Sequence, residues 1–309
     1  MPQEIFDSVP PVGVNLDRPS VARVYDYILG GTANWAIDRQ FGDQVLTKVP
    51  LVKDIALANR LFLNRTVRYL TRQGVRQFLD IGAGVPTAGN THQLADELAM
   101  EEGRTPDARV VYVDNEPVAV AHAEALLDQE GDDRRHAVIE ADLRAPDELW
   151  RKALDTELLD TSEPIAMLII AVLHVQQPDH TGREVGPDAV ARLRAFLPGG
   201  SYVAISHATD DGVPPDIAPG LADIKKLYDS SSSKVIWRKH EEIEALLGDY
   251  EVVEPGWCWT SEWHPEESGS NAPAITFPAP NYAIVWAGVG KKPLSSTDSI
   301  SSGRLESTE

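Results

Sequence analysis

The sequence of 309 residues predicts an α/β protein with a mostly parallel sheet, helices on both of its faces and a helical segment in front. Three observations predict this fold. Short β-type runs alternate with helical runs between residues 76 and 207, apolar residues recur at helical spacing before residue 74, and a Gly-x-Gly turn follows the first β-type run. Such alternation is typical of right-handed βαβ units.

The first 74 residues precede the sheet. Residues 1–18 are Pro-rich without periodicity, and we expect an extended arm there. Residues 19–74 are expected to form a helical cap, because apolar spacing predicts three helices, at Val21–Leu29, Ala36–Leu46 and Val52–Arg72. The Gly30-Gly31 pair directly after the first helix is a stop signal.

Residues 75–290 are expected to form the sheet domain. Five strands are predicted, at Arg76–Ile81, Arg109–Asp114, His136–Glu140, Ile165–Leu173 and Ser201–His207. The intervening helices are predicted at Thr91–Glu102, Pro117–Gln129, Pro146–Asp155 and Pro187–Phe196. Two further helices and two strands are expected at Asp216–Tyr228, Lys239–Leu247, Tyr250–Glu254 and Tyr282–Gly288. Residues 291–309 are rich in Ser and Thr, and a disordered tail is expected there.

Composition excludes several classes of partner. The net charge is −20, from 48 acidic against 28 basic residues, which argues against a nucleic-acid surface and against docking on anionic lipid. The single cysteine, Cys258, cannot form an intramolecular disulfide, and no spacing of ligands predicts a metal site. The N-terminus lacks the pattern of a signal peptide, and the longest apolar run, Ile165–Leu173, is too short to span a bilayer. A cytoplasmic protein is expected.

The turn after the first predicted strand is the clearest signal for a ligand. Phe78-Leu79-Asp80-Ile81-Gly82-Ala83-Gly84 places an acidic residue on a strand that runs into Gly-x-Gly, at the sheet edge where open α/β proteins bind ligands. The dinucleotide version of this turn needs a third glycine, but that position holds Thr87 after Pro86. The charge of Asp80 favours a cationic or zwitterionic ligand such as S-adenosylmethionine, which carries an ammonium, a sulfonium and no phosphate.

Two further acidic residues end neighbouring strands. Asp114 follows Val110–Val113, in a position to accept hydrogen bonds from a ribose diol. Asp142 ends the third strand, where it can accept from an adenine amino group while Leu143 packs on the ring. Taken alone, each acid is better explained as a turn or cap residue. Three acids at adjacent strand ends together favour a ligand that contains adenosine.

Two histidines are the candidates for catalysis. His174 follows the fourth strand and His207 ends the fifth, so both lie at the edge that presents groups to the reacting end of a ligand. The alternatives are that His174 only caps its strand and that His207 is a buried structural residue. No Gly-x-Ser-x-Gly turn supports a hydrolase.

The chain resembles a family of S-adenosylmethionine-dependent methyltransferases that is common in actinobacteria and long described as a domain of unknown function. The resemblance runs from about Pro19 to about Gly288. It is carried by Pro19–Gly31, Asp80–Thr87, Val113–Pro117, Ala141–Leu143, Leu173-His174, Gly200–Tyr202 and Ser206-His207. The chain departs from the family pattern at Thr32-Ala33, before Asn34-Trp35, and in the loop after His174.

The resemblance implies a Rossmann-like class I methyltransferase sheet, mostly parallel with one antiparallel strand near the C-terminus, under an N-terminal helical cap. It also implies that the cap closes over the cofactor, with Arg23 on the methionine carboxylate and Tyr25 and Tyr27 beside the sulfonium. The cofactor residues that the residue analysis and the resemblance together predict are Arg23, Tyr27, Gly31, Asp80, Gly82, Gly84, Asp114, Asn115, Asp142 and Leu143.

The function predicted on this basis is methyl transfer from S-adenosylmethionine to a small molecule. A non-catalytic S-adenosylmethionine-binding protein, such as a metabolite sensor, is the alternative, and a nicotinamide-dependent oxidoreductase is disfavoured by Pro86 and Thr87. The acceptor pocket is expected between the cap, the loop after His174 and the loop after His207. Its polar residues predict a polar acceptor rather than a lipid: Gln176, Gln177, His180 and Arg183.

Overall fold

The structure is a computed structural model that describes residues 14–86, 89–229, 231 and 233–294. Its described strands form one sheet of eight, in the order β3-β2-β1-β4-β5-β8-β6, with β7 paired to β8. Their bounds are β1 Gln77–Ile81, β2 Arg109–Asp114, β3 His136–Glu140, β4 Ala166–Ile170, β5 Tyr202–Ala208, β6 Glu251–Val252, β7 Cys258–Trp259 and β8 Val285–Lys291. Strands β1 to β5 pair in parallel, and β8 runs antiparallel to its three partners.

The order of the strands changes direction at β1. Strand β2 pairs with one side of β1 and β4 with the other, both in parallel, so Asp80 lies beside Tyr112 on β2 and Leu168 on β4. An open α/β sheet leaves a crevice outside the carboxyl ends of the strands at such a switch point. The fold therefore places the end of β1, with its Gly-x-Gly turn, where a ligand crevice is expected.

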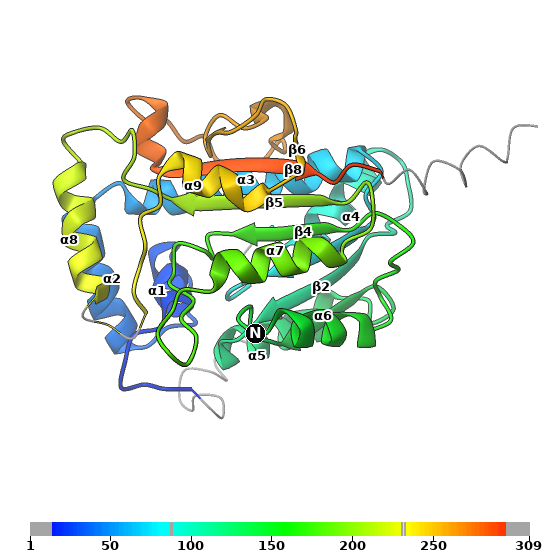
Figure 1. Cartoon of the computed structure of the whole chain (residues 1–309), viewed down its shortest axis with the longest axis horizontal. Helices are drawn as coiled ribbons and strands as arrows, with labels where there is room; N and C mark the ends of the chain where they lie inside the picture. Colours follow the sequence, from blue (N-terminus) through cyan, green and yellow to red (C-terminus); the bar gives the residue numbers. More distant parts are fainter. Residues whose placement is uncertain (1–13, 87–88, 230, 232, 295–309) are drawn as a thin grey trace, which may run out of the picture.

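Helices cover both faces of the sheet because alternate side chains of a strand point to opposite faces. Leu79 and Ile81 of β1 pack in one apolar cluster with α6 (Pro146–Asp155), α7 (Gly186–Phe196) and α9 (His240–Glu244). Phe78, between them, packs in a second cluster with α3 (Val52–Arg72), α4 (Thr91–Glu101) and α5 (Pro117–Glu130). Figure 1 shows α6 and α7 in front of the sheet and α3 and α4 behind it.

A third apolar cluster lies beyond the carboxyl ends of β4 and β5. It joins α1 (Val21–Ile28), α2 (Ala36–Lys48) and α8 (Ala218–Asp229) to the first half of α3, through Val24, Phe41, Ile55 and Leu221. Figure 1 shows α1, α2 and α8 past the arrowheads of these strands. Because the second half of α3 covers the sheet, the expected boundary at residue 74 between cap and sheet domain falls after a helix that packs in both.

Most elements agree with the prediction from sequence, and four differences stand out. Strand β4 ends at Ile170 instead of Leu173, because Ala171 has a positive φ of 61° that no strand continues. Strand β8 begins at Val285, after a 3₁₀ helix over Pro280–Ala283, and β7 was not predicted. The remaining 3₁₀ helices are Ala245–Leu247 and Pro265–Glu267.

The fourth difference is at the C-terminus. Strand β8 continues to Lys291, and the Lys292 backbone N–H donates to the Ser201 carbonyl, so residue 291 belongs to the sheet, residue 292 is hydrogen-bonded next to it, and neither belongs to the tail expected from residue 291. Residues 295–309 of that tail, and residues 1–13 of the expected arm, lie outside the described residues. Within the described ranges, no helix combines the length and the apolar character needed to cross a membrane.

Candidate functional site

A cavity of about 420 Å³ opens at the carboxyl ends of β1, β2 and β4, and we call it the sheet-edge cavity. Its walls are α1, the middle of α3, the turn after β1, the segment after β2 and the turn after β4. The volume is within the range of small-molecule sites. Six of the predicted site residues line it: Asp80, Gly82, Gly84, Asp114, Asn115 and His174.

The turn after β1 exposes its backbone to this cavity. Gly82 and Gly84 both have a φ of +68°, a conformation that residues with a Cβ rarely adopt. The space that a Cβ on Gly84 would occupy is open, with no heavy atom within 4 Å. The Gly82 N–H donates to the Val113 carbonyl, which ties the turn to the end of β2. A ligand can therefore approach the backbone at Gly84 closely.

Asp114 is held rigidly at the same edge. Its Oδ2 accepts from the Gly84 backbone N–H at 2.8 Å, and its Oδ1 accepts from the Glu116 backbone N–H at 2.8 Å. Burial raises the pKa of Asp114, and these backbone donors act in the opposite direction. Each carboxylate oxygen can accept a further hydrogen bond. The arrangement fixes two carboxylate oxygens of Asp114 at the edge of the cavity.

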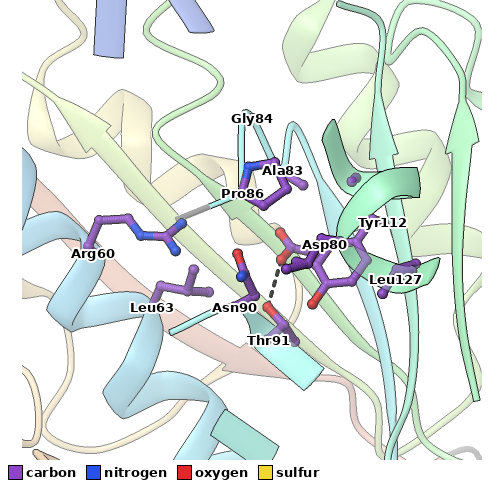
Figure 2. A pocket seen from close by; sticks show the side chains of 12 residues that line it. Arg60, Leu63, Asp80, Ala83, Gly84, Pro86, Asn90, Thr91, Tyr112 and Leu127 are labelled. Carbon is purple, nitrogen blue, oxygen red and sulfur yellow. Dashed lines mark hydrogen bonds between the residues drawn. The ribbon is translucent and has the colours of Figure 1, made fainter. Parts of the chain in front are cut away.

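Asp80 lies deeper, beside a second and much smaller pocket. Figure 2 shows its side chain between Thr91 at the start of α4 and Tyr112 on β2, with Arg60 entering from α3. Thr91 Oγ1 donates to Asp80 Oδ2 at 2.6 Å. Burial raises the pKa of Asp80 to about 6, although Thr91 and the charge of Arg60 oppose the rise. At neutral pH the carboxyl is therefore close to its titration point.

Two residues predicted for the adenine end do not line the cavity. Both Asp142 oxygens accept from the guanidinium of Arg144, at 2.9 Å to Nε and 2.5 Å to Nη2, and it is Arg144 that lines the cavity. Leu143 is buried in the core with Leu149 and Trp150. Asp142 thus has a charged partner of its own, and in this position it holds the side chain of Arg144 in place.

Three further predicted residues also lie away from the cavity, because α1 turns 100° per residue and presents only one stripe to it. That stripe is Val21, Ala22, Tyr25, Asp26 and Leu29. Arg23, on another side of α1, is 1% exposed and forms ion pairs with Asp38 at 2.9 Å and Glu116 at 3.2 Å. The methionine carboxylate that the resemblance assigns to Arg23 would have to displace these pairs.

Tyr27 and Gly31 have structural surroundings. The Tyr27 hydroxyl donates to Asp43 Oδ1 on α2 at 2.6 Å, on the exposed side of the cap. Gly31 packs directly on the carboxylate of Asp26, so that a Cβ at residue 31 would overlap it. Gly31 therefore lets Asp26 take its place at the cavity wall.

His174 is the histidine that reaches the cavity. Its Nδ1 has no hydrogen-bond partner among the described residues and is shielded from solvent. Burial, and next the charge of Arg238, lower the pKa of His174 to about 4. The imidazole is therefore neutral at physiological pH, and it can accept a proton or a hydrogen bond from a bound molecule.

His207, the second histidine predicted as a candidate base, does not line the cavity. His207 is 0% exposed, its Nδ1 lies 2.6 Å from the Ala208 carbonyl and its Nε2 lies 2.8 Å from Nη1 of Arg238. A carbonyl only accepts and a guanidinium only donates, so Nδ1 carries the proton and Nε2 accepts. Burial also lowers the pKa of His207 well below its usual range. Both ring nitrogens are occupied, and the role this geometry supports is structural.

The predicted acceptor region is only partly correct. Gln176 and Gln177 line the cavity, whereas His180 is exposed and Arg183 pairs with Asp188 at 3.0 Å. In the described part of the chain, the loop after His207 contributes no lining residue, and Ser233 is there instead. The reason is that residues 234–236 pair with the His174 loop and cover it: the His174 carbonyl accepts from the Ile236 N–H at 2.8 Å.

A hydrogen-bonded chain behind the cavity was not predicted. Asn59 Nδ2 donates to the Tyr25 hydroxyl at 3.3 Å, Ser206 Oγ donates to Asn59 Oδ1 at 2.6 Å, and the Ala171 N–H donates to Ser206 Oγ at 3.0 Å. It joins α1, α3 and β5 to Ala171, whose positive φ starts the turn that carries His174. No local signal predicts that Tyr25 and Ser206 are connected through Asn59, because only the fold brings these residues together.

The fold and the site together define a doubly wound α/β protein with a small-molecule site at its switch point. The chain belongs to the S-adenosyl methyltransferase family, whose profile matches residues 8–293. It is similar to a crystal structure of a protein from Thermobifida fusca assigned as a methyltransferase, at 33% identity over 93% of this chain and 99% of that chain, with a TM-score of 0.76.

A DUF574 family protein from Streptomyces avermitilis is similar at 31% identity, over 90% of this chain and 98% of that one, with a TM-score of 0.76. A comparison with curated proteins finds no match. These likenesses extend over nearly the whole chain, cap included, so the helical cap is shared with relatives and is no addition to this chain.

Proposed function

We propose that this methyltransferase uses S-adenosylmethionine, bound in the sheet-edge cavity, to methylate a small polar molecule. The observation that supports this most is the pairing of the Gly82–Gly84 turn with Asp114 across the β1–β2 edge. This pairing offers a ligand an open backbone and two fixed hydrogen-bond acceptors, but it lacks the third glycine of the turn that binds dinucleotide phosphates. Family membership points to the same cofactor.

The residues present fit such a cofactor. Gly84 leaves room for a ligand against the backbone, and Asp114 presents fixed acceptors for hydroxyls. The cofactor, when bound, supplies a methyl group activated on a sulfonium. The cavity walls orient the acceptor and exclude water, which lowers barriers by roughly 7–11 kcal/mol in well-aligned systems.

His174 is proposed to contact the acceptor. Its ring lines the cavity and is neutral, so it can take the proton of a hydroxyl or an amine as the new bond to carbon forms. Gln176 and Gln177 lie on the same wall and can orient polar groups by hydrogen bonds. Together they support a polar acceptor.

Calorimetry with S-adenosylhomocysteine tests the cofactor. We expect the wild type to bind it in a single site and Asp114→Ala to bind more weakly by about 1–3 kcal/mol, because polar partners are left unpaired. NADH should bind weakly or not at all. Equal affinities of wild type and Asp114→Ala would remove Asp114 from the site, and tight NADH binding would favour an oxidoreductase.

Turnover separates an enzyme from a sensor. We expect S-adenosylhomocysteine to form from S-adenosylmethionine when a library of polar metabolites is supplied, with the protein at catalytic concentration. Tight binding of the cofactor with no product across the library would support a non-catalytic binding protein instead.

A further inference from the structure

The wall of the sheet-edge cavity contains two opposite charges that have no ion-pair partner in the described residues. Asp26 belongs to the cavity stripe of α1, and Arg60 lies in the middle of α3. Arg23, also on α1, differs from them because Asp38 and Glu116 both form ion pairs with it. This pair was not among the residues predicted from sequence.

Asp26 is a buried carboxylate whose hydrogen-bond partners among the described residues are neutral. It is 4% exposed, and Asn34 Nδ2 donates to its Oδ2 at 2.8 Å. Burial raises the pKa of Asp26, and the nearby charge of Asp38 adds to the rise, while Asn34 and the Ala33 backbone oppose it. A buried carboxylate without a cation is costly. A cationic group of a ligand at this wall would relieve that cost.

Arg60 is the matching cation. Its Nη2 donates to the Gly89 carbonyl at 3.3 Å, and its guanidinium lines both the sheet-edge cavity and the small pocket of Asp80 (Figure 2). A guanidinium has five donors in a fork that fits a carboxylate. One donor is used in this hydrogen bond, so the others are available to an anionic group.

The fold brings these two residues to one place. A hydrogen bond connects the two helices, in which Asn59 Nδ2 on α3 donates to the Tyr25 hydroxyl on α1. Asp26 directly follows Tyr25, and Arg60 directly follows Asn59. Along α1, Asp26 lies six residues beyond Ser20, whose Oγ donates to Glu116 beside the diol acceptor Asp114. At 1.5 Å per residue, the rise along α1 from Ser20 to Asp26 is about 9 Å. A nucleoside held at Asp114 would reach them with a 5′ substituent.

We propose that Asp26 and Arg60 form a subsite for an α-amino acid zwitterion, in which Asp26 binds the ammonium and Arg60 binds the carboxylate. The inference rests on the proposed function, since the amino acid is the methionine or homocysteine tail of the cofactor. It transfers to α3 the carboxylate contact that the resemblance placed on Arg23. It also explains why Gly31 is small: the missing Cβ is the space that the Asp26 carboxylate fills.

Two nucleosides that differ only in the tail provide the test. S-adenosylhomocysteine carries the zwitterion, and 5′-methylthioadenosine ends in a methyl thioether. We expect Asp26→Asn and Arg60→Met each to weaken S-adenosylhomocysteine about 10- to 100-fold, the range for loss of a hydrogen bond to a charged group, and to change 5′-methylthioadenosine less than about threefold. Arg60→Lys should recover part of the affinity, because it keeps the charge without the fork.

The controls remove the same charges from the exposed face of α3. Asp54 and Lys53 are exposed and do not line the cavity, so Asp54→Asn and Lys53→Met should bind both nucleosides as the wild type does. Retained binding of 5′-methylthioadenosine shows that a variant is folded. Unchanged affinity for S-adenosylhomocysteine in Asp26→Asn and Arg60→Met would overturn the inference, as would equal losses for both nucleosides. A wild type that binds neither nucleoside would contradict the proposed function itself.

Discussion

At the scale of single residues, a charged side chain is available to a ligand only if its neighbours leave it free. Asp114 and Asp142 both end a strand, yet backbone N–H groups hold Asp114 at the cavity, whereas Arg144 neutralises Asp142. Arg23 and Arg60 differ in the same way, since two carboxylates surround Arg23. The local sequence is equally suggestive for each member of these pairs, and the contacts decide between them.

The backbone at Gly84 gives a test at this scale. Gly84→Ala forces an alanine into a positive φ, at about 1–2 kcal/mol, and its methyl group projects into the cavity. Gly74→Ala is the matched control, since Gly74 also has a positive φ and open space but lies at the end of α3. We expect both to lower the free energy of unfolding similarly in urea. Only Gly84→Ala should weaken S-adenosylhomocysteine in calorimetry, and equal affinities would place the ligand elsewhere.

His174 gives a second test. Replacement of its ring by an amide in His174→Gln should lower turnover by about 10²–10⁴-fold if it takes a proton from the acceptor. Cofactor affinity should stay nearly unchanged, because the ring belongs to the acceptor side. Parallel calorimetry and product assays check both. A loss of affinity as large as the loss of turnover would make His174 a binding residue, and full activity would mean that orientation of the acceptor is sufficient.

At the scale of elements, α1 connects the cap to the sheet with one side and lines the cavity with another. The connecting side carries Arg23, whose guanidinium also donates to the carbonyls of Asn15 and Arg18. Its partner Glu116 lies in the segment between β2 and α5, next to Asp114. The position of the cavity stripe of α1 therefore depends on the ion pairs of Arg23, a residue that does not itself line the cavity.

Removal of Arg23 from its buried ion pair with Asp38 should strongly destabilise the protein. Arg23→Met leaves Asp38, which is 0% exposed, as a buried charge without its cation, and about 3–5 kcal/mol of stability should be lost. The double variant Arg23→Met/Asp38→Asn should lose less, since the fully buried charge is removed and only the partly exposed Glu116 is left without its cation. Urea unfolding measures both.

The exposed pair Arg151–Asp155 on α6 is the control for that experiment. Arg151→Met should leave the urea midpoint nearly unchanged, because exposed pairs contribute little. If the Arg23→Met/Asp38→Asn protein is no more stable than Arg23→Met, the stranded charge is not the cause of the loss.

At the scale of the whole molecule, one buried face of the sheet and the cap cluster share helix α3, so the cap and the sheet are expected to unfold together. Several titratable groups are buried in these layers without a charge partner. His136, at the start of β3, contacts the ring of His92 with centroids 4.6 Å apart, and burial and the neighbouring charges lower the pKa of His136 to about 4. His174 has a pKa lowered to about the same value.

These depressed pKa values set the pH dependence of stability. A histidine near pKa 6.5 in the unfolded chain and about 4 in the fold binds protons preferentially in the unfolded state. The contribution of such a histidine to the free energy of unfolding is complete above pH 6.5, and it is lost as the pH falls from 6.5 to 4. Each such histidine accounts for about 3 kcal/mol, so acid should destabilise the protein steeply across this window.

A variant isolates one of these histidines. His136 Nδ1 accepts from the Asp132 backbone N–H at 3.1 Å, and the side-chain oxygen of His136→Asn can replace this acceptor. We expect the fall in unfolding free energy between pH 6.5 and 4 to become smaller in His136→Asn. His180→Gln, which removes an exposed histidine, should keep the slope of the wild type. Identical slopes in all three proteins would contradict the assignment to His136.

Much of the fold follows from local patterns. The helix over Val52–Arg72 and the strands over Arg109–Asp114 and His136–Glu140 have the predicted bounds, because apolar spacing and turn residues act within a few residues of chain. The prediction failed at Ala171, where an apolar run continues past the end of β4. Periodicity carries no information on a positive φ that contacts with Ser206 and Asn59 support.

The sequence by itself determined the order of strands and helices, the glycine turn at Gly82–Gly84 and the place of Asp114 at the end of β2, since these depend on the chain's own neighbours. The tertiary structure decided which charges are free. Arg23 and His207 match a family motif, but partners from distant elements occupy them, whereas Asp26 and Arg60 face the cavity without an ion-pair partner in the described residues. The reason is that burial and ion pairing depend on contacts between distant elements, and a local stretch of sequence carries no information on those contacts.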